Sequence, residues 1–482
     1  MENTVKRRVN GGVKAAEKPP VRKKQSKSGF LKGAAWIAIG GFVAKIIGAL
    51  YRIPLTNLIG GYGLGLYQMV YPVYCLLLTV SATGIPSSIA KLTAERIGRG
   101  QSTMPLFKTA MRLFLLIGAF GALLMCVLAP FLANAQGSRA VLGGYFTLAP
   151  SVLLVSAISV FRGWFQGRNN MKPTAFSEIT EQLVKVGFGL GFAYLFRANV
   201  ERAVVFLLLA VSISELCALF LMIFWFQRVP APLETLQAEE KVSAKTVLKL
   251  SVPVTFSSMI LPLSSLLDSV LVPRLLGAYA TDAVTLYGLF SGGAVTVINL
   301  PVSICYGIAA ASVPAVAAAA ARKTDKKIEK NGGNGKNKKE KSPRKRVLYS
   351  LFVTVAVALP SAVGLYLFAE PAARIIYRSL TGAELETLVG LIRIFSVSAL
   401  TLACAQTLSA CLTAQGKPQY AALSMLAGMT VKTVLYVWWL RNPSISVFGL
   451  AHATNIAYFV AFLLDLLYNL WVSRKKKPRE SA

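Results

Sequence analysis

Long apolar segments recur along almost the whole chain, and they constrain its fold more strongly than any other feature. A membrane-spanning helix needs about 20 mostly apolar residues. Segments of this kind lie near residues 33–50, 64–90, 109–133, 141–161, 174–196, 203–226, 247–272, 284–318, 347–369, 387–414, 419–440 and 446–472. Hydrophobic side chains make up 55% of the 482 residues, too many for an ordinary soluble domain. We therefore predict an all-α polytopic membrane protein with about 12 transmembrane helices.

Positive charge is concentrated on one side of this predicted topology. Lys and Arg number 52 and Asp and Glu 20, which gives a formal net charge of +32. The cations cluster in the two terminal tails and in the connections at 91–112, 162–172, 227–249 and 322–346. Cytoplasmic loops of membrane proteins carry such an excess, so both termini are predicted to be cytoplasmic. We expect the basic segments to contact anionic membrane lipids and no nucleic acid.

Composition divides the chain into two similar halves. The regions 33–227 and 246–472 each contain six candidate spans and are predicted to form six-helix lobes, joined by a polar cytoplasmic linker at 228–245. The remaining segments are a basic tail at 1–32, a basic tail at 473–482 and a charged segment at 323–346. This last segment is rich in Gly and Asn and lacks aromatic residues, so it is predicted to be a disordered cytoplasmic loop. WFQGRNNMKPTAFS in the first half resembles TAQGKPQYAALS in the second, which indicates a parallel transporter repeat or a chance likeness between apolar segments.

Few residues are suited to enzymatic or metal chemistry. The single histidine, His452, lies in the last apolar segment, where a packed and hydrogen-bonded role is the common one. The six cysteines fall within apolar segments without a CxxC pair and are interpreted as packing residues. The sequence contains no Walker motif, and its polar first 32 residues do not resemble a cleavable signal peptide. We therefore expect a transporter and not an enzyme, with no catalytic residue, cofactor or metal.

Charged side chains within the apolar segments are the strongest candidates for function. A charge at the centre of a transmembrane helix costs about 2.5–3.5 kcal/mol on insertion scales, so it is expected to face a cavity or a partner. The candidates are Lys45, Arg52, Glu181, Lys185, Arg274 and Lys432. Most are cations, and Lys and Arg pair well with phosphate, so a phosphorylated substrate is predicted. An interfacial position is the alternative for Arg52 and Arg274, and Glu181 and Lys185 are spaced to neutralise each other.

Glycine and proline interrupt several of the same segments. Gly84 and Pro86 lie in the second segment, and Pro301 lies in the eighth. Broken helices are tolerated at membrane depth where the backbone lines a cavity or is buried in protein. We predict that these three residues form hinges or cavity wall, and kinks that serve packing alone are the alternative.

Several motifs carry a resemblance to a known family. The most specific is GALYRIPLTNLIGGYGLGLYQMVYPVYCLLLTVSATGIPSSIAKLTAE at 48–95. Further matches are SEITEQLVKV at 177–186, DSVLVPRLLG at 268–277, NLPVSICYGIAAASVPAVA at 299–317 and QTLSACLTAQGKPQYAA at 406–422. Together they resemble the polysaccharide-biosynthesis branch of the multidrug/oligosaccharidyl-lipid/polysaccharide (MOP) flippase superfamily. Within it, the nearest likeness is the stage V sporulation protein B group, which is related to the MurJ-type lipid II flippases.

The resemblance implies two six-helix lobes around a central cavity that opens alternately to either side of the membrane. It also implies that basic side chains of the first lobe hold the pyrophosphate of a lipid-linked substrate. That role falls to Lys45 and Arg52, with Gln68 in the cavity wall formed by the second span.

The chain departs from the family pattern in two respects. Many relatives have fourteen helices, of which the last two form a groove for the polyprenyl tail, whereas twelve are predicted here. MurJ-type proteins also carry a cavity arginine just before the proline of the eighth span, where this chain reads SGGAVTVINLP. Arg274 is the candidate substitute for that arginine.

The leading hypothesis is a monomeric flippase of the bacterial plasma membrane whose partner is a lipid-linked oligosaccharide. Its substrate would be an undecaprenyl-pyrophosphate-linked cell-wall precursor, with lipid II as the first choice, moved from the inner to the outer leaflet. A teichoic acid or capsular oligosaccharide-lipid flippase of the same fold is one alternative. A cation-coupled multidrug exporter is a second, although its cavity is expected to be rich in carboxylates and aromatic residues. A membrane scaffold for envelope synthesis is the third.

Overall fold

The regular elements are helical throughout the part of the chain that the structure describes. The computed structural model describes residues 27–80, 84–229, 243–303, 305 and 343–474. The first half contains α1 (Lys27–Leu78), α2 (Ile85–Gly98), α3 (Met104–Ala135), the 3-10 turn η2 (Arg139–Val141), α4 (Leu142–Gly167), α5 (Lys172–Leu195) and α6 (Val200–Gln227). The second half contains α7 (Ala244–Ser258), α8 (Ile260–Leu276), α9 (Ala283–Gly288), the π-helical segment η3 (Leu289–Ala294), α11 (Pro343–Leu367), α12 (Ala369–Ile376), α13 (Gly382–Ala414), α14 (Pro418–Trp439) and α15 (Phe448–Arg474).

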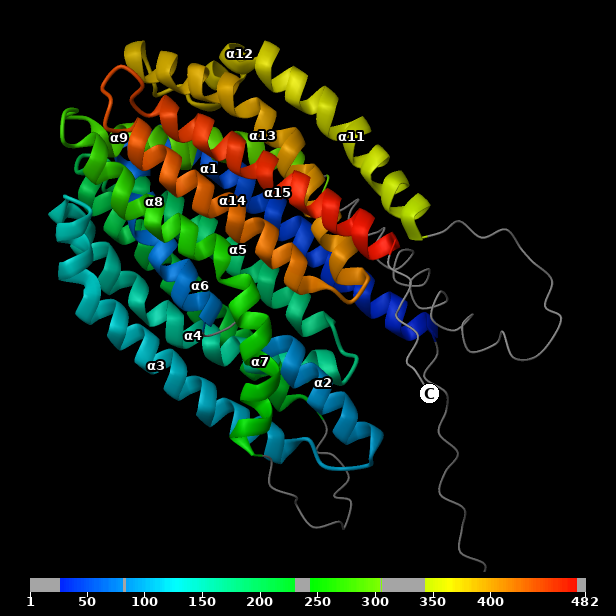
Figure 1. The fold of residues 1–482 in the computed structure, drawn as a ribbon. Helices are drawn as coiled ribbons and strands as arrows, with labels where there is room; N and C mark the ends of the chain where they lie inside the picture. Colours follow the sequence, from blue (N-terminus) through cyan, green and yellow to red (C-terminus); the bar gives the residue numbers. More distant parts are fainter. Residues whose placement is uncertain (1–26, 81–83, 230–242, 304, 306–342, 475–482) are drawn as a thin grey trace, which may run out of the picture.

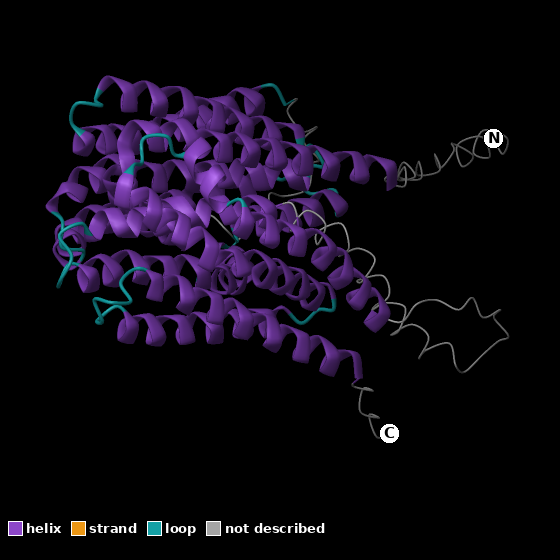
Figure 2. Ribbon diagram, turned by 90° about the horizontal axis from the view of Figure 1, so that it is seen from above, coloured by secondary structure: helices purple, strands orange, loops and turns teal. Residues whose placement is uncertain are grey.

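The long helices lie roughly side by side in one bundle (Figure 1, Figure 2). In Figure 1, α3 lies at one edge and α11 at the opposite edge, with α1 between them. α1 packs against α4, α5 and α6, and also against α8, α9 and η3. The helices α11, α13, α14 and α15 pack mainly against each other. α1 is therefore the element that joins the two groups of helices.

Length and composition suit this bundle to a membrane. Within the described ranges, eight helices are long and apolar enough to cross one. Their outward faces are apolar as well: on α3, the side chains of Leu116, Phe120 and Phe131 are largely exposed. Large apolar side chains are stable in such positions when lipid surrounds them. The prediction of an all-α polytopic membrane protein is confirmed.

The first two predicted spans have different boundaries in the structure. The sequence predicts helices at 33–50 and 64–90, but a single element, α1, runs through most of both with a kink at Gly60. The φ of 65° and ψ of −173° at this residue are not helical, and glycine adopts positive φ at little cost. An unbroken span to residue 90 is wrong, because a new helix, α2, begins at Ile85. Pro86 lies in the first turn of α2, where its missing N–H costs no helical hydrogen bond.

The seventh predicted span is also divided. The sequence predicts one helix at 247–272, whereas α7 and α8 are separate helices that meet at Met259. Pro262 lies in the first turn of α8, again where a helix tolerates proline. The eighth predicted span, 284–318, is helical to residue 303, and most of its remainder lies outside the described residues.

Several predicted segments lie wholly or mostly outside the described residues. They are the tails at 1–32 and 473–482, the linker at 228–245 and the loop at 323–346. The disorder of that loop and the division into lobes at 33–227 and 246–472 therefore stay predictions.

Candidate functional site

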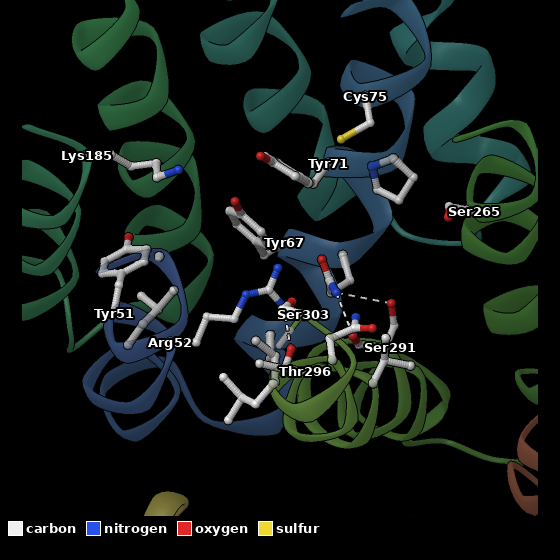
Figure 3. A pocket seen from close by; sticks show the side chains of 18 of the residues that line it. Tyr51, Arg52, Tyr67, Tyr71, Cys75, Lys185, Ser265, Ser291, Thr296 and Ser303 are labelled. Atoms are coloured by element: carbon white, nitrogen blue, oxygen red, sulfur yellow. Dashed lines mark hydrogen bonds between the residues drawn. The ribbon is translucent and has the colours of Figure 1, made fainter. Parts of the chain in front are cut away.

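A cavity of about 610 Å³ lies between α1, α5, α8 and the helical residues that follow α9 (Figure 3). Its polar lining consists of Tyr51, Arg52, Tyr67, Gln68, Tyr71, Gln182, Lys185, Ser265, Ser291, Thr296, Asn299 and Ser303. Two of these side chains are cationic, and none of the described residues in the lining carries a carboxylate. The cavity is therefore polar with a net positive charge.

Arg52 enters the cavity from α1. Its Nη1 donates a hydrogen bond of 2.6 Å to Oγ1 of Thr296, which lies 244 residues later in the chain. The side chain is half-buried and forms no ion pair with any described residue. In Figure 3, the polar ends of Arg52, Tyr67, Tyr71 and Lys185 turn toward one space. The hydrogen bond with Thr296 thus orients the guanidinium without neutralising it.

Lys185 enters the same cavity from α5. Within the described part of the chain, its Nζ has no hydrogen bond and no ion pair. The alternative in which Glu181 neutralises Lys185 is not observed, because the two side chains form no ion pair. Oε2 of Glu181 instead accepts from Nη2 of Arg162 on α4 at 3.2 Å, and Glu181 does not line the cavity. This arrangement leaves the Lys185 ammonium facing the open volume.

One face of α1 forms a wall of the cavity. Tyr67, Tyr71 and Cys75 recur at four-residue spacing, which places them in one row along the helix. The rings of Tyr67 and Tyr71 stack with centroids 5.0 Å apart. Beside them, Nε2 of Gln68 donates to O and Oγ of Ser291 at 2.8 and 3.1 Å. Gln68 therefore joins α1 to η3 and also lines the cavity.

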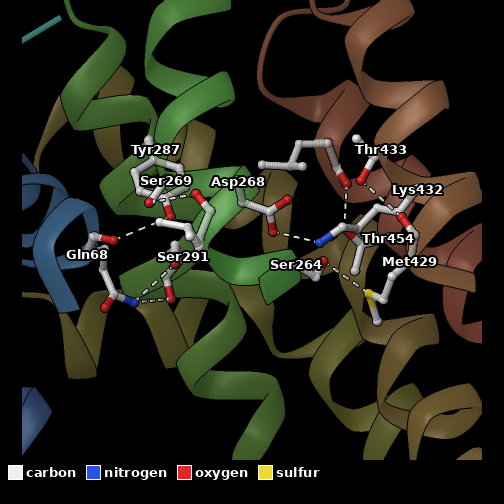
Figure 4. A network of polar contacts seen from close by, with 12 residues as sticks. Gln68, Ser264, Asp268, Ser269, Tyr287, Ser291, Met429, Lys432, Thr433 and Thr454 are labelled. Atoms are coloured by element: carbon white, nitrogen blue, oxygen red, sulfur yellow. Dashed lines mark hydrogen bonds and ion pairs between the residues drawn. The ribbon is translucent and has the colours of Figure 1, made fainter. Parts of the chain in front are cut away.

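Lys432 belongs to a separate polar network beside the cavity (Figure 4). Its Nζ lies 2.6 Å from Oδ2 of Asp268 on α8, and the two side chains are only 6% and 14% exposed. Oδ1 of Asp268 is buried and has no hydrogen-bond partner among the described residues. The hydroxyl of Tyr287 donates to the backbone oxygen of Gln68 at 3.4 Å, and so connects this region to the cavity wall. Asp268 neutralises the charge of Lys432 within the protein.

The other predicted site residues lie in different places. Arg274 is exposed at the C-terminal end of α8 and does not line the cavity. Lys45 lies in α1, but its side chain is outside the described part of the structure, so its role stays a prediction. Pro301 lies in the helical segment whose residues Leu300 and Ser303 line the cavity.

Gly84 lies at a tight crossing between the start of α2 and α7. A Cβ atom at this position would lie 2.5 Å from the backbone oxygen of Ser251 and 2.8 Å from Oγ1 of Thr255. A Cβ atom at Gly163 of α4 would likewise lie 2.8 Å from the backbone oxygen of Pro86. Glycines therefore let the start of α2 pack closely against both α7 and α4. Whether this contact acts as a hinge stays a prediction.

Sequence reasoning missed several residues of the site. Tyr67 and Tyr71 had a usable signal, because Tyr67 is next to the candidate Gln68 and Tyr71 lies four residues further along the same helix. Thr296 had none, since it is recognised only through its contact with Arg52 on another helix. Arg162, which pairs with Glu181 outside the cavity, had no such signal either. Among the described residues, no group of three or more His, Cys, Asp or Glu side chains is placed to hold a metal ion.

Comparison with known proteins places these features in a family. A family model described as polysaccharide biosynthesis protein matches residues 30–320, which is more than half of the chain. The chain belongs to this family. The match includes α1 from residue 30 and the elements from α2 to α9, and with them the described residues that line the cavity. The resemblance noted in the sequence motifs is confirmed.

Individual relatives match the chain over most of its length. Stage V sporulation protein B of Bacillus subtilis (strain 168) is 27% identical and covers 91% of this chain and 83% of its own. The lipid II flippase MurJ of the same organism is 22% identical, over 91% of this chain and 82% of the flippase. An inward-facing multidrug resistance MATE family transporter of the MOP superfamily has a TM-score of 0.69 at 14% identity, over 89% and 94% of the two chains. This last likeness shows the fold, and none of the three proteins is named as an enzyme.

Proposed function

We propose that this protein is a membrane flippase. It moves an undecaprenyl-pyrophosphate-linked cell-wall precursor, with lipid II as the first choice, from the inner to the outer leaflet of the bacterial plasma membrane by alternating access. The observation that carries the proposal is the pair Arg52 and Lys185, two cations that face one cavity in whose described lining there is no carboxylate.

Two cations without a counter-charge favour an anionic ligand. Each is costly to hold away from water unless an opposite charge pairs with it. A pyrophosphate presents several charged oxygens close together, so it is able to accept hydrogen bonds from Arg52 and Lys185 at once. Such bonds between ionised groups are roughly twice as strong as neutral ones. Thr296 holds one nitrogen of Arg52 and leaves the other guanidinium N–H groups for the ligand.

The rest of the lining offers polar and aromatic groups that could contact a sugar bonded to the pyrophosphate. Gln182 and Asn299 offer amide donors and acceptors, and Tyr67 and Tyr71 offer aromatic faces and hydroxyl groups. The volume of about 610 Å³ falls within the usual range of small-molecule sites. It accommodates a pyrophosphate and an attached sugar, whereas the long prenyl tail would lie in the surrounding lipid.

The cavity also bears on the competing functions. A cation-coupled multidrug exporter has support from the fold likeness to the MATE family transporter, but a cationic drug would be repelled by Arg52 and Lys185. A flippase for teichoic acid or capsular oligosaccharide lipids would use the same pyrophosphate contacts. Among the candidate substrates we favour lipid II, because one relative is named as a lipid II flippase.

Alternating access requires elements that change their relative positions. We assign hinge roles to Gly84, Pro86 and Pro301, and we assign the moving bodies to the lobes predicted at 33–227 and 246–472. Lys45 and Arg52, seven residues apart on α1, would face the substrate from one wall, because two helical turns separate them. In this proposal the protein is a monomer with cytoplasmic termini, and its basic segments contact anionic lipids.

Leaflet exchange in proteoliposomes tests this function. The full chain is reconstituted with fluorescent lipid II, and the fraction accessible to an impermeant quencher is followed over time. The matched control is the same glycan on an undecaprenyl monophosphate, which lacks one phosphate. Faster exchange of lipid II than of the control supports the proposal. Equal rates for both lipids, or exchange no faster than in empty liposomes, would contradict it.

A further inference from the structure

A second cavity, of about 380 Å³, lies at the ends of α4 and α6, away from the substrate cavity. It is lined by Phe165, Arg168, Asn170, Trp225, Arg228 and Val229. The two helices belong to candidate membrane spans that end at Gly167 and Gln227. Each arginine is therefore the first residue after an apolar span, at the level where lipid headgroups meet water.

Both arginines of this cavity are held in place, and neither is neutralised by the described residues. Cζ of Arg168 lies 4.5 Å from the centre of the Trp164 ring, and Cζ of Arg228 lies 3.8 Å from that of Phe224. Neither guanidinium forms an ion pair within the described ranges. Burial lowers the pKa of Arg168, which reflects partial desolvation of its charge. Two like charges in one cavity repel each other unless an anion lies between them.

The walls of this cavity are braced by neighbouring helices. Trp164, beneath Arg168, is almost fully buried, and its Nε1 donates to Oγ1 of Thr103 at 3.1 Å. Trp225 stacks on Phe176 of α5 with ring centroids 6.3 Å apart. The geometry around the two arginines is therefore set before any ligand arrives, which lowers the entropy lost on binding.

An apolar stripe on α6 leads to the cavity. Leu216, Phe220 and Phe224 are 40%, 61% and 45% exposed, and they recur at four-residue spacing that continues to Arg228. Residues with this spacing lie on the same side of a helix. The stripe gives an acyl chain a path along the membrane-facing surface that ends at a cation. A free phosphate ion has no apolar part that would contact this stripe.

We propose that this cavity binds the headgroup phosphate of an anionic glycerophospholipid, with one acyl chain along the Leu216–Phe220–Phe224 stripe. Arg168 and Arg228 line this cavity together, and the charge pattern of the sequence predicts that they lie on the cytoplasmic side. The site is separate from the cavity of Arg52 and Lys185, and it does not depend on the flippase proposal.

Native mass spectrometry of the full chain with dioleoyl phosphatidylglycerol tests this site. The variant Arg168→Gln/Arg228→Gln is compared with Lys108→Gln/Arg112→Gln, which removes two exposed cations from the start of α3. The first variant is expected to bind this lipid at least about tenfold more weakly than wild type, because each cation near an anionic surface contributes appreciably to binding. The control is expected to stay within about twofold of wild type, since its cations line no described cavity. Equal losses in both variants would overturn the proposal.

Two further arms separate the lipid from other ligands and guard against misfolding. Phe220→Ser should weaken lipid binding several-fold without changing any charge, and Arg168→Lys/Arg228→Lys should retain much of it. Excess inorganic phosphate should not displace the lipid. Displacement by phosphate, or unchanged lipid binding in Phe220→Ser and in the glutamine variant, would show that no such phospholipid site exists.

Discussion

Two regions of the molecule hold cations within the helical bundle, and they differ in whether a carboxylate of the protein pairs with the cation. Between α8 and α14, Lys432 pairs with Asp268 at 2.6 Å and is almost completely buried. In the cavity beside them, Arg52 and Lys185 face about 610 Å³ of open volume with no carboxylate in the described lining. A cation that the protein neutralises itself serves packing, whereas one that faces a cavity without a counter-charge is available to a ligand.

Substitutions in the two regions should therefore affect different properties, folding stability in one and transport in the other. Removing one partner of the buried pair leaves the other charge without compensation, so the folded state should suffer. Removing a cavity cation relieves an unpaired charge, so the folded state should tolerate it while ligand binding is lost.

The largest effect is expected from Asp268→Leu, which leaves the Lys432 ammonium buried and unpaired. Breaking a buried pair in this way costs about 3–5 kcal/mol of unfolding free energy. Thermal unfolding of the purified protein in detergent should therefore show a marked loss of stability. The double variant Asp268→Leu/Lys432→Met removes both charges and should recover most of it. A double variant that is stable but does not flip lipid would instead assign Lys432 to transport, as the sequence predicts.

The next effect concerns transport. Lys185→Ala and Arg52→Ala should each lower the rate of lipid II exchange by at least about tenfold, because each removes a charged hydrogen-bond donor worth about 1.5–3 kcal/mol. Thermal stability should change little. Arg52→Lys should be intermediate if paired contacts to phosphate matter. Gln182→Ala, in the same lining but uncharged, is the matched control and should lose less. Exchange at the wild-type rate in both alanine variants would remove the cations from the mechanism.

The sequence alone predicts the helical architecture well because apolar segment length is a local property. It also predicts three cavity residues, Arg52, Gln68 and Lys185, since polarity within an apolar segment is visible without a structure. It does not predict which charges are neutralised. Lys432 and Asp268 are 164 residues apart in the chain, and their pairing depends on how α14 packs against α8.

Local spacing also misleads in one case. Glu181 and Lys185 stand four residues apart on α5, the spacing of a helical ion pair. Glu181 pairs with Arg162 of α4 instead, because helix packing brings that guanidinium to 3.2 Å. The boundary errors have a similar origin. Gly60 and Gly84 are visible in the sequence, but only the packed structure shows that one kinks a helix and the other precedes a new one.

A smaller effect is expected at the crossing of α2 and α7. Gly84→Ala places a Cβ atom 2.5 Å from the backbone oxygen of Ser251, so the helices must shift. We expect a loss of about 1–3 kcal/mol in stability and a several-fold slower exchange of lipid II. The matched control is Gly364→Ala on α11, where the added Cβ atom meets open space. Identical behaviour of the two variants would exclude a special role for the crossing.

The smallest effect is expected for Arg274→Gln. This side chain is exposed at the end of α8 and does not line the cavity, so lipid II exchange should stay within about twofold of wild type, as for a typical surface charge. The same exchange assay measures it. A loss comparable to that of Lys185→Ala would show that Arg274 substitutes for a cavity arginine, as the family resemblance implies.

Binding of a pyrophosphate lipid measures whether Arg52 and Lys185 hold an anionic ligand. Farnesyl pyrophosphate and uncharged farnesol are titrated into purified wild-type protein and into Arg52→Gln/Lys185→Gln, with Asp268→Leu/Lys432→Met as the variant that alters the neutralised pair. The pyrophosphate is expected to bind wild type at least about tenfold more tightly than it binds the cavity variant. Farnesol should show no such preference, and the Asp268 and Lys432 variant should bind the pyrophosphate almost normally. Equal pyrophosphate affinity in wild type and the cavity variant would show that Arg52 and Lys185 do not hold the pyrophosphate.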